Sequence, residues 1–244
     1  MAQFRNGGAA FTRAAILFFG SLACIFGAAA VFHPDTPLPD GWNPIKPLDV
    51  DDSYTAFTDW KLSKALSDPT MCRAALAQIA TFQSTGTKAH ENPNCGIENT
   101  VVVDQILGVN LGALETDCQT ALRTAMWIRY ELAPASERIL GKTLTRIDQL
   151  GSYSCRQIRT TAGNSARMST HATAMAIDVA GFRFDDGTRL RLISDWNDPT
   201  SRGEYLHVAR DGACDWFRTT LSPEYNALHA DHFHLQAIGW GSCR

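Results

Sequence analysis

The sequence predicts an α+β fold, in which a small antiparallel sheet packs with helices and an N-terminal transmembrane helix precedes them. Three observations lead to this prediction. Short strand-like runs and a helix are mixed from residue 147 onward, apolar residues recur at helical spacing between residues 55 and 135, and an uncharged apolar run lies near the N-terminus. With 244 residues, 45% of them hydrophobic, the chain is long and apolar enough to bury a core.

The apolar run covers residues 14–32 and contains no charged side chain. A helix needs about 20 apolar residues to cross the hydrocarbon core of a membrane. Because Arg5 and Arg13 precede the run, we expect residues 1–13 to form a cytoplasmic tail and the rest of the chain to be exported. The length favours an uncleaved anchor in the inner membrane. A signal peptide cleaved after the small residues 28–30 is the alternative.

The next segment, residues 33–54, contains five prolines, which favour extended and semi-rigid chain. We therefore expect a spacer between the membrane and a globular domain of residues 55–244. In that domain Asp68 followed by Pro69 predicts the start of a helix that continues as far as Phe82.

Residues 101–103 are three valines and predict a short strand. Thr116 with Gln119 is typical of a capping box that opens a second helix, and Pro134 is expected to disturb or end that helix. The remaining strand-like runs are residues 147–153, 176–182, 190–193 and 232–237, and a further helix is expected over residues 203–217.

Seven cysteines are present, and Cys24 lies in the apolar run. The other six have no Cys-x-x-Cys pair, so their spacing does not indicate a metal site. In an exported domain an even number of cysteines predicts disulfides, here three, and the sequence leaves 15 connectivities open. The six candidates are Cys72, Cys95, Cys118, Cys155, Cys214 and Cys243.

The formal net charge is −3, so there is no excess of basic residues for a nucleic-acid partner. The chemistry is indicated instead by histidines and one aspartate. Asp178 lies in a strand-like run between Ile177 and Val179 and should face away from both. A buried, ionised and unpaired carboxylate is costly, and a metal ion or a cationic partner would remove that cost. His171 precedes the strand and is placed to reach the same ion.

A second motif is the Asp-His-Phe-His-Leu segment that begins at Asp231. In an extended segment His232 and His234 point to one face, and Phe233 points to the other. Two imidazoles would therefore enter one pocket. Together with His171 and Asp178 they supply a His, an Asp and a His as ligands, with a second His alongside. A catalytic Zn²⁺ site commonly has three protein ligands and leaves one position open.

These residues resemble the zinc peptidases of the D-alanyl-D-alanine carboxypeptidase and penicillin-insensitive murein endopeptidase group. The resemblance is carried by Ser169, His171 and Asp178, followed later by the His-x-His pair. Those relatives usually have a glycine where this chain has Ala174.

More closely, the chain resembles the bacterial extensin-like C-terminal domain family, over residues 40–244. The matching segments are residues 44–48, 152–156, 171–182 and 229–235, with Cys214, Phe217, Tyr225, Asn226, Cys243 and Arg244.

The resemblance implies zinc ligands at His171, Asp178 and His234. It leaves the general base open, because carboxypeptidase relatives place a glutamate where this chain has Asp231, and murein endopeptidase relatives place a histidine where it has His232. Strand alternation favours His232, since Asp231 should face away from His234. Asp231 would then orient an imidazole.

The resemblance also implies that Arg156 contacts the substrate. Ser169 and His229 are further candidates for such a contact, and the alternative for His229 is a loop residue without that role. Arg156 would hold a peptide carboxylate or stabilise an oxyanion, and the alternative for this residue is a surface salt bridge. Arg159 and Arg167 are weaker candidates for the same role.

We therefore expect a periplasmic zinc metallopeptidase, tethered to the inner membrane, whose partner and substrate is peptidoglycan. The His-x-His form favours a cross-link endopeptidase. A D,D- or L,D-carboxypeptidase of the same fold is the alternative, and a non-catalytic wall-binding or scaffolding protein is the alternative from another class.

Overall fold

The structure is a computed structural model that describes residues 7–33, 35–36, 38–161 and 163–244. The chain divides into two compact units, Met1–Leu62 and Ser63–Arg244. Arg5, with the first six residues of the expected tail, and Pro34 and Pro37 of the expected spacer lie outside the described residues.

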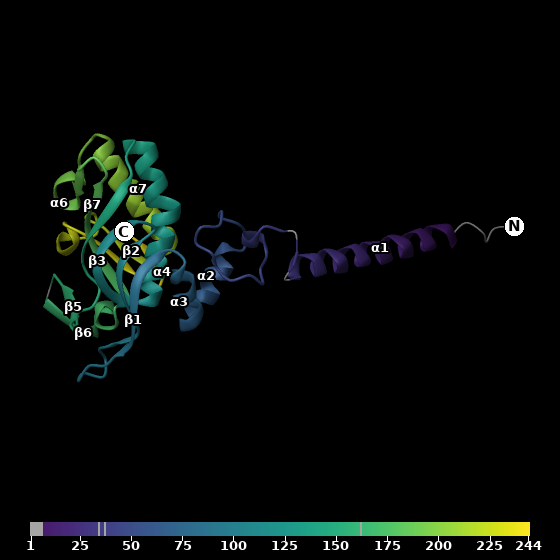
Figure 1. The fold of residues 1–244 in the computed structure, drawn as a ribbon, viewed down its shortest axis with the longest axis horizontal. Coiled ribbons are helices and arrows are strands. Elements are labelled where there is room, and N and C mark those ends of the chain that lie inside the picture. Colours follow the sequence, from purple (N-terminus) through teal and green to yellow (C-terminus); the bar gives the residue numbers. More distant parts are fainter. Residues whose placement is uncertain (1–6, 34, 37, 162) are drawn as a thin grey trace. The chain divides into compact units, whose positions relative to one another are not determined.

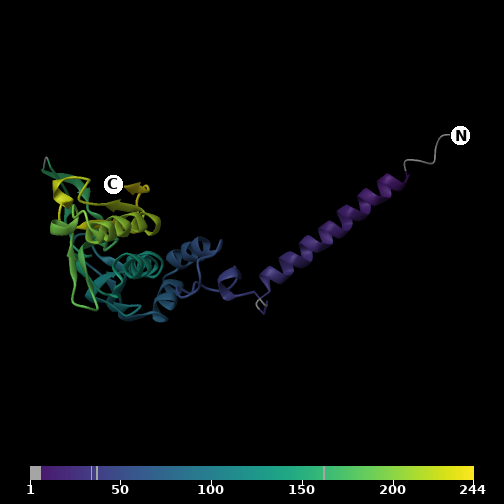
Figure 2. The same ribbon diagram turned by 90° about the horizontal axis from the view of Figure 1, so that it is seen from above.

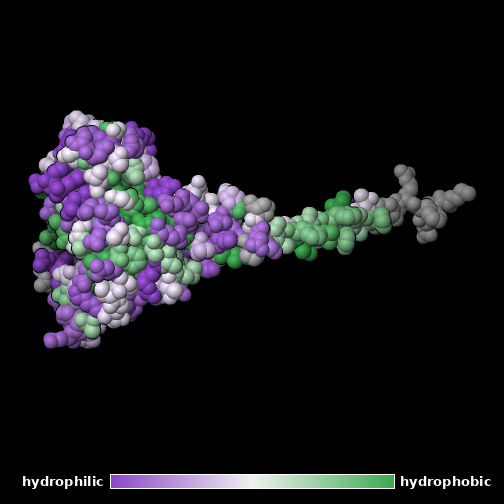
Figure 3. All heavy atoms as spheres, viewed as in Figure 1, coloured by the Kyte–Doolittle hydropathy of each residue, from purple (hydrophilic) through white to green (hydrophobic). Residues whose placement is uncertain are grey.

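The first unit begins with helix α1 (Gly7–Phe32). Its stretch Phe11–Phe32 is long and apolar enough to cross a membrane, and none of that window is buried. Figure 3 shows the continuous hydrophobic surface of this helix. Its length, composition and position fit a membrane anchor or a signal peptide.

The segment after α1 is folded, which differs from the extended spacer that its prolines predict. A short 3-10 helix, η1 (Asp40–Trp42), is followed by the buried side chains of Leu48 and Val50. The hydroxyl of Thr55 donates to the carbonyl of Gly41 at 2.8 Å and joins the two ends of this segment. Apolar residues between the prolines are thus buried, and a side-chain hydrogen bond closes the loop.

Helices α2 (Thr58–Ser67) and α3 (Pro69–Ala77) lead into the second unit. Asp68 caps α3 as predicted, because its side chain accepts from the backbone N–H groups of Thr70 and Met71. The helix ends five positions earlier than the sequence pattern predicts, because it stops at Ala77 and Phe82 lies in a strand.

In the residues that follow, the strand predicted at residues 101–103 is confirmed, but the mainly helical pattern expected around it is wrong, because three antiparallel strands form there. They are β1 (Ala80–Lys88), β2 (Ile97–Ile106) and β3 (Val109–Asp117). A tight turn at Leu107 and Gly108, both with positive φ, joins β2 to β3. A turn with two positive φ angles matches the twist of the two strands of a hairpin. It therefore allows β2, which contains the β-branched residues 101–103, to pair with β3 along its length.

Helix α4 (Cys118–Trp127) is capped by Asp117, whose side chain accepts from the N–H of Gln119. The predicted cap, Thr116, instead hydrogen-bonds inside the core. The helical path also continues past Pro134, through η2 (Ile128–Leu132), α5 (Ala133–Ala135) and η3 (Ser136–Leu140). The two η segments are π-helical. Their wider turns let the helical path continue past Pro134, although proline has no N–H to donate.

The main sheet has nine strands and is larger than the small sheet that the sequence predicts. Its order is β1-β2-β3-β4-β7-β10-β9-β11, and β8 pairs with β7 (Figure 1). Most pairs are antiparallel, but β3–β4 and β9–β11 are parallel. Strands β5 and β6 form a separate hairpin. The further bounds are β4 (Leu144–Gly151), β5 (Gln157–Thr160), β6 (Gly163–Met168), β7 (Ala176–Phe184), β8 (Arg189–Arg191), β9 (Thr219–Leu221), β10 (Phe233–Gln236) and β11 (Ser242–Cys243).

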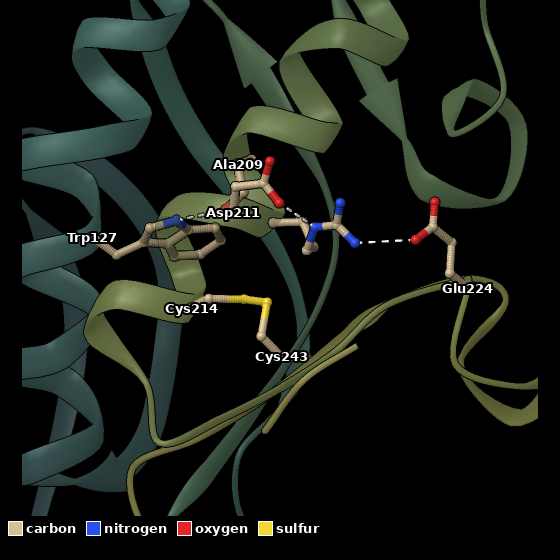
Figure 4. Close-up of a disulfide and its surroundings, with 7 residues drawn as sticks. Trp127, Ala209, Asp211, Cys214, Glu224 and Cys243 are labelled. Atoms are coloured by element: carbon tan, nitrogen blue, oxygen red, sulfur yellow. Dashed lines mark hydrogen bonds and ion pairs between the residues drawn. A yellow bond between two sulfur atoms is a disulfide. The ribbon is translucent and has the colours of Figure 1, made fainter. Parts of the chain in front are cut away.

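Two helices, α4 and α7 (Ser201–Trp216), lie side by side and cover one face of this sheet (Figures 1 and 2). A short helix α6 (Leu192–Asp195) precedes α7. Trp127 anchors the layer, since its ring lies edge-on to Phe182 at 5.9 Å and its Nε1–H donates to the carbonyl of Ala209 (Figure 4). The mixed α+β architecture is therefore confirmed.

The six predicted cysteines form three disulfides: Cys72–Cys118, Cys95–Cys155 and Cys214–Cys243. The first joins α3 to α4, and the third joins α7 to β11 (Figure 4). Cys24 is exposed on α1 and takes no part in them.

Candidate metal centre

Three of the predicted side chains converge at the paired strands β7 and β10. Asp178 and His234 lie directly opposite each other in the antiparallel register, so their side chains share one face. His171 comes from η4 (Thr170–Thr173), the 3-10 turn that precedes β7. The ligand atoms of the three residues lie within 4.8 Å of one another.

The backbone around His171 is shaped to present its ring. Ser169 caps the turn by accepting from the N–H of His171, and Ala174 then adopts a left-handed conformation with φ of 53°. Glycine adopts this conformation most easily, so the alanine here is a strained residue. The carbonyl of Ala174 accepts from the hydroxyls of Thr116 and Ser152, each at 3.2 Å, so buried polar contacts hold the strained residue in place.

A backbone carbonyl fixes the tautomer of His171. Nδ1–H of this ring donates to the carbonyl of Ser152 at 2.8 Å, so Nε2 presents a lone pair. That Nε2 lies 3.0 Å from Nδ1 of His234 and 3.2 Å from Oδ1 of Asp178. Only 3% of His171 is exposed, so water does not satisfy the lone pair.

The donor set fits a divalent metal ion. Nδ1 of His234 lies 2.8 Å from Oδ1 of Asp178. When His171 and His234 are neutral, the three ligand atoms (Nε2 of His171, Nδ1 of His234 and Oδ1 of Asp178) have at most one proton among them, the one on Nδ1 of His234. A cation between them satisfies all three. In a tetrahedral zinc site the ligand atoms stand about 3.3 Å apart, given bonds of about 2.0–2.1 Å. The separations here are slightly shorter, and two imidazoles with one carboxylate leave a position open.

The electrostatics keep these groups in the forms that bind a metal. Burial raises the pKa of the Asp178 carboxyl, but the neighbouring imidazoles of His171 and His234 outweigh burial and hold that pKa well below its usual range. Burial lowers the pKa of His234, and Asp178 offsets this only in part. The carboxyl is therefore ionised and His234 neutral at pH 7.

The sequence pattern did not single out Gln236, which supports His234 from the next residue on the same face of β10. Its amide Nε2 lies 2.9 Å from Nε2 of His234. When Nδ1 of His234 binds a metal ion, Nε2 of the same ring carries the proton. Rotating the Gln236 amide by half a turn then brings its oxygen into position to accept a hydrogen bond from that Nε2–H. Period-two spacing after His234 is the signal that identifies this residue.

The geometry separates the two candidates for a general base. Nε2 of His232 lies 3.8 Å from Oδ1 of Asp178, so the ring faces the centre. Asp231 is more than half exposed and accepts from Nδ1–H of His232 at 2.7 Å. Asp231 thus orients the imidazole from behind, and His232 is the residue whose free nitrogen points inward.

His229 completes the histidine cluster. Its ring centroid lies 5.3 Å from that of His232 and 5.8 Å from that of His234. Nδ1–H donates to Oδ1 of Asn226 at 2.8 Å. Burial, together with the neighbouring His234 and His232, lowers the pKa of His229 to about 4. This ring is therefore neutral at pH 7.

A pocket of about 560 Å³ opens onto the centre. Asp178, His232 and His234 line this pocket. Arg156 and residues of the hairpin β5–β6 line it as well. The three residues that were expected to contact a substrate, Arg156, Ser169 and His229, all line this pocket. Further lining comes from Tyr225, Asn226, Leu228, Ile158, Arg159, Arg167 and Met168.

A second group of potential ligands, His90 with Cys95 and Cys155, is not a metal site in this state. The two sulfur atoms form a disulfide, so neither is a thiolate donor. Nδ1 of His90 lies 3.8 Å from Sγ of Cys155.

Comparison with protein families gives one match. The family model described as extensin-like protein C-terminus matches residues 70–244, more than two thirds of the chain. The searches of curated proteins and of solved structures each returned no match.

Proposed function

Because the chain belongs to the extensin-like protein C-terminus family and its matched region contains this centre, we propose that it is an exported zinc-dependent peptidase that hydrolyses amide bonds in peptidoglycan. The observation that carries the proposal is the convergence of His171, Asp178 and His234 beside an oriented free imidazole. We favour cross-links over single stem peptides, because the residue facing the centre is His232, as in the murein endopeptidases that the motif resembles.

A zinc ion bound by the three ligands would supply Lewis acidity, polarising the scissile carbonyl and lowering the pKa of a coordinated water towards about 7. The chain itself supplies the proton transfer. Nε2 of His232 accepts a proton from the attacking water and returns it to the leaving nitrogen, so that hydrolysis yields one carboxylate and one amine. Asp231 holds the imidazole in the tautomer with Nε2 free. Arg156, at the edge of the pocket, orients the peptide.

The apolar helix α1 supports the location that this substrate requires. Peptidoglycan lies outside the cytoplasmic membrane, and three disulfides suit an oxidising compartment. We propose that α1 anchors the protein in the inner membrane and leaves the domain in the periplasm.

The direct test is digestion of purified sacculi by the protein, with and without a chelator, followed by chromatography of the muropeptides. We expect cross-linked muropeptides to decrease only in the presence of zinc. Loss of terminal residues with cross-links intact would instead indicate a carboxypeptidase. Unchanged muropeptides at one zinc per chain would contradict hydrolysis and support a wall-binding role.

Variants separate the roles. His234→Ala should abolish zinc binding, and a stoichiometry that stays at one zinc would contradict the ligand assignment. His232→Ala should keep zinc and lose about 10²–10⁴-fold in rate, the usual contribution of a general base. Activity that survives there but is lost in Asp231→Asn would move the base to Asp231. His90→Gln, at an exposed histidine outside the pocket, is the matched control.

A further inference from the structure

The hairpin β5–β6 stands apart from the main sheet and forms one wall of the pocket (Figure 1). Its base is fixed to the metal-ligand turn, because the N–H of Ser169 donates to the carbonyl of Arg156 at 3.0 Å. From this base the strands extend to the paired residues Thr160 and Gly163. The hairpin is therefore positioned to contact parts of a ligand that lie away from the metal centre.

Three arginines project from this hairpin region into the lining of the pocket: Arg156, Arg159 and Arg167. Among the residues that the structure describes, no carboxylate lies within ion-pair distance of any of the three. Elsewhere in the same unit Arg183 and Arg202 each contact an aspartate at 3.0 Å or less. The guanidinium groups of Arg159 and Arg167 thus have no carboxylate partner among the described residues, and that of Arg156 donates to the carbonyl of Gln157 at 3.3 Å.

The charge of the pocket is correspondingly one-sided. Within the described lining the only carboxylate is Asp178, and its Oδ1 lies 3.2 Å from Nε2 of His171 and 2.8 Å from Nδ1 of His234. The chain as a whole has a net charge of −3, so the positive pocket is a local feature. A cleft lined with one sign of charge concentrates ligands of the opposite sign, and the planar fork of arginine matches a carboxylate in particular.

We propose that the β5–β6 hairpin is an anion subsite, in which Arg159 and Arg167 bind a carboxylate of the substrate that is remote from the scissile bond. The ligand class is a peptide with at least two free carboxylates. Arg156 lies at the base of the hairpin, where its carbonyl accepts from the N–H of Ser169, whereas Arg159 pairs with Asn164 farther along the hairpin. The inference rests on the proposed function for the identity of the site, but the binding that it describes requires no hydrolysis.

The test measures binding by the full chain in detergent micelles, with fluorescence anisotropy as the readout. One probe is a labelled tripeptide of alanine, γ-linked D-glutamate and diaminopimelate, and the other is the same peptide with its carboxylates amidated. We expect the acidic probe to bind more tightly, with an affinity that falls as salt is raised. Arg159→Gln with Arg167→Gln should weaken the acidic probe by about 100-fold, about tenfold for each charged hydrogen-bond donor, and leave the amidated probe unchanged.

Arg191→Gln is the matched control, because Arg191 is exposed and lies outside the pocket. Arg159→Glu with Arg167→Glu should reverse the preference between the two probes, and circular dichroism checks that each variant is folded. Equal affinity of the unaltered protein for both probes would overturn the subsite, as would an unchanged affinity in the double glutamine variant.

The outcomes also separate this inference from the proposed function. A carboxylate preference without any digestion of sacculi would leave the subsite standing and contradict the peptidase. Zinc-dependent digestion of sacculi without a carboxylate preference would support the peptidase and contradict the subsite.

Discussion

The disulfide Cys95–Cys155 should control zinc affinity as well as stability. Backbone groups on both sides of it hold the turn that carries His171: the N–H of Gly96 donates to the carbonyl of Ala172, and the N–H of Ser154 donates to the carbonyl of His171, each at 2.9 Å. Replacing both cysteines by serine removes the covalent link between these two donors.

Two magnitudes follow from the structure. The bridged cysteines are 60 residues apart, so loop closure in the unfolded chain is worth about 4.3 kcal/mol at 25 °C. Loosening the groups around a metal ligand typically costs 10–100-fold in affinity, and we expect zinc binding to weaken about tenfold. The carbonyl of Ser152, which orients His171, lies three residues before Cys155 and loosens with it.

The matched control is the disulfide Cys214–Cys243, which spans 29 residues and closes a loop worth about 3.6 kcal/mol. The two double-serine variants should therefore lose similar free energies of unfolding, measured by denaturant titration with zinc absent. Only the Cys95 and Cys155 variant should bind zinc more weakly, measured by competition with a chelator. Equal zinc affinity in the two variants would refute the reasoning and show that the turn holds His171 without the bridge.

Three further predictions concern single side chains near the centre. Ser152→Ala should lower the free energy of unfolding, measured by urea titration, by about 1–3 kcal/mol, because Thr116 loses its buried hydroxyl partner. Zinc affinity, measured by competition with a chelator, should stay the same, because His171 donates to the backbone carbonyl of residue 152. Gln236→Ala should weaken zinc binding about tenfold and Gln236→Glu should strengthen it, and the opposite order would contradict the assigned contact with His234. His229, whose pKa falls from 6.5 in the unfolded chain to about 4 in the fold, binds a proton more readily when unfolded, so stability should be complete above about pH 6.5 and decline towards pH 4. His229→Gln should flatten that decline in metal-free protein, and an unchanged pH profile would contradict the shift.

Local patterns predicted some elements well and failed where tertiary contacts overrode them. The cap at Asp68 was predicted because an aspartate before a proline satisfies the first helical N–H groups locally. The helix through Phe82 was wrong, since pairing of β1 with β2 determines the conformation of that segment, and a spacing rule does not include a distant partner strand. Thr116 matched a capping motif, yet its hydroxyl lies in the core against Ser152, 36 residues away.

The same distinction applies to the candidate centre. Strand alternation predicted that Asp178 and His234 avoid the core face of their strands, and the structure places them opposite each other in the register of β7 and β10. Gln236 follows the same period. The orientation of His171 by the carbonyl of Ser152 has no signal in the sequence, because any residue at that position provides a carbonyl. His232 faces the centre and Asp231 faces outward, as strand alternation predicts. The hydrogen bond between these two side chains is a feature of the tertiary structure that alternation does not predict.

By itself, the sequence determined the apolar N-terminal helix, the presence of six cysteines outside it and the strand faces on which Asp178 and His234 lie, because these depend on composition and on periods of a few residues. Only the tertiary structure decided which cysteines pair, how nine strands are ordered and which backbone carbonyl fixes the tautomer of a metal-ligand candidate. Those features join residues that are tens of positions apart. Strand register and chain topology bring them together, and local periodicity encodes neither.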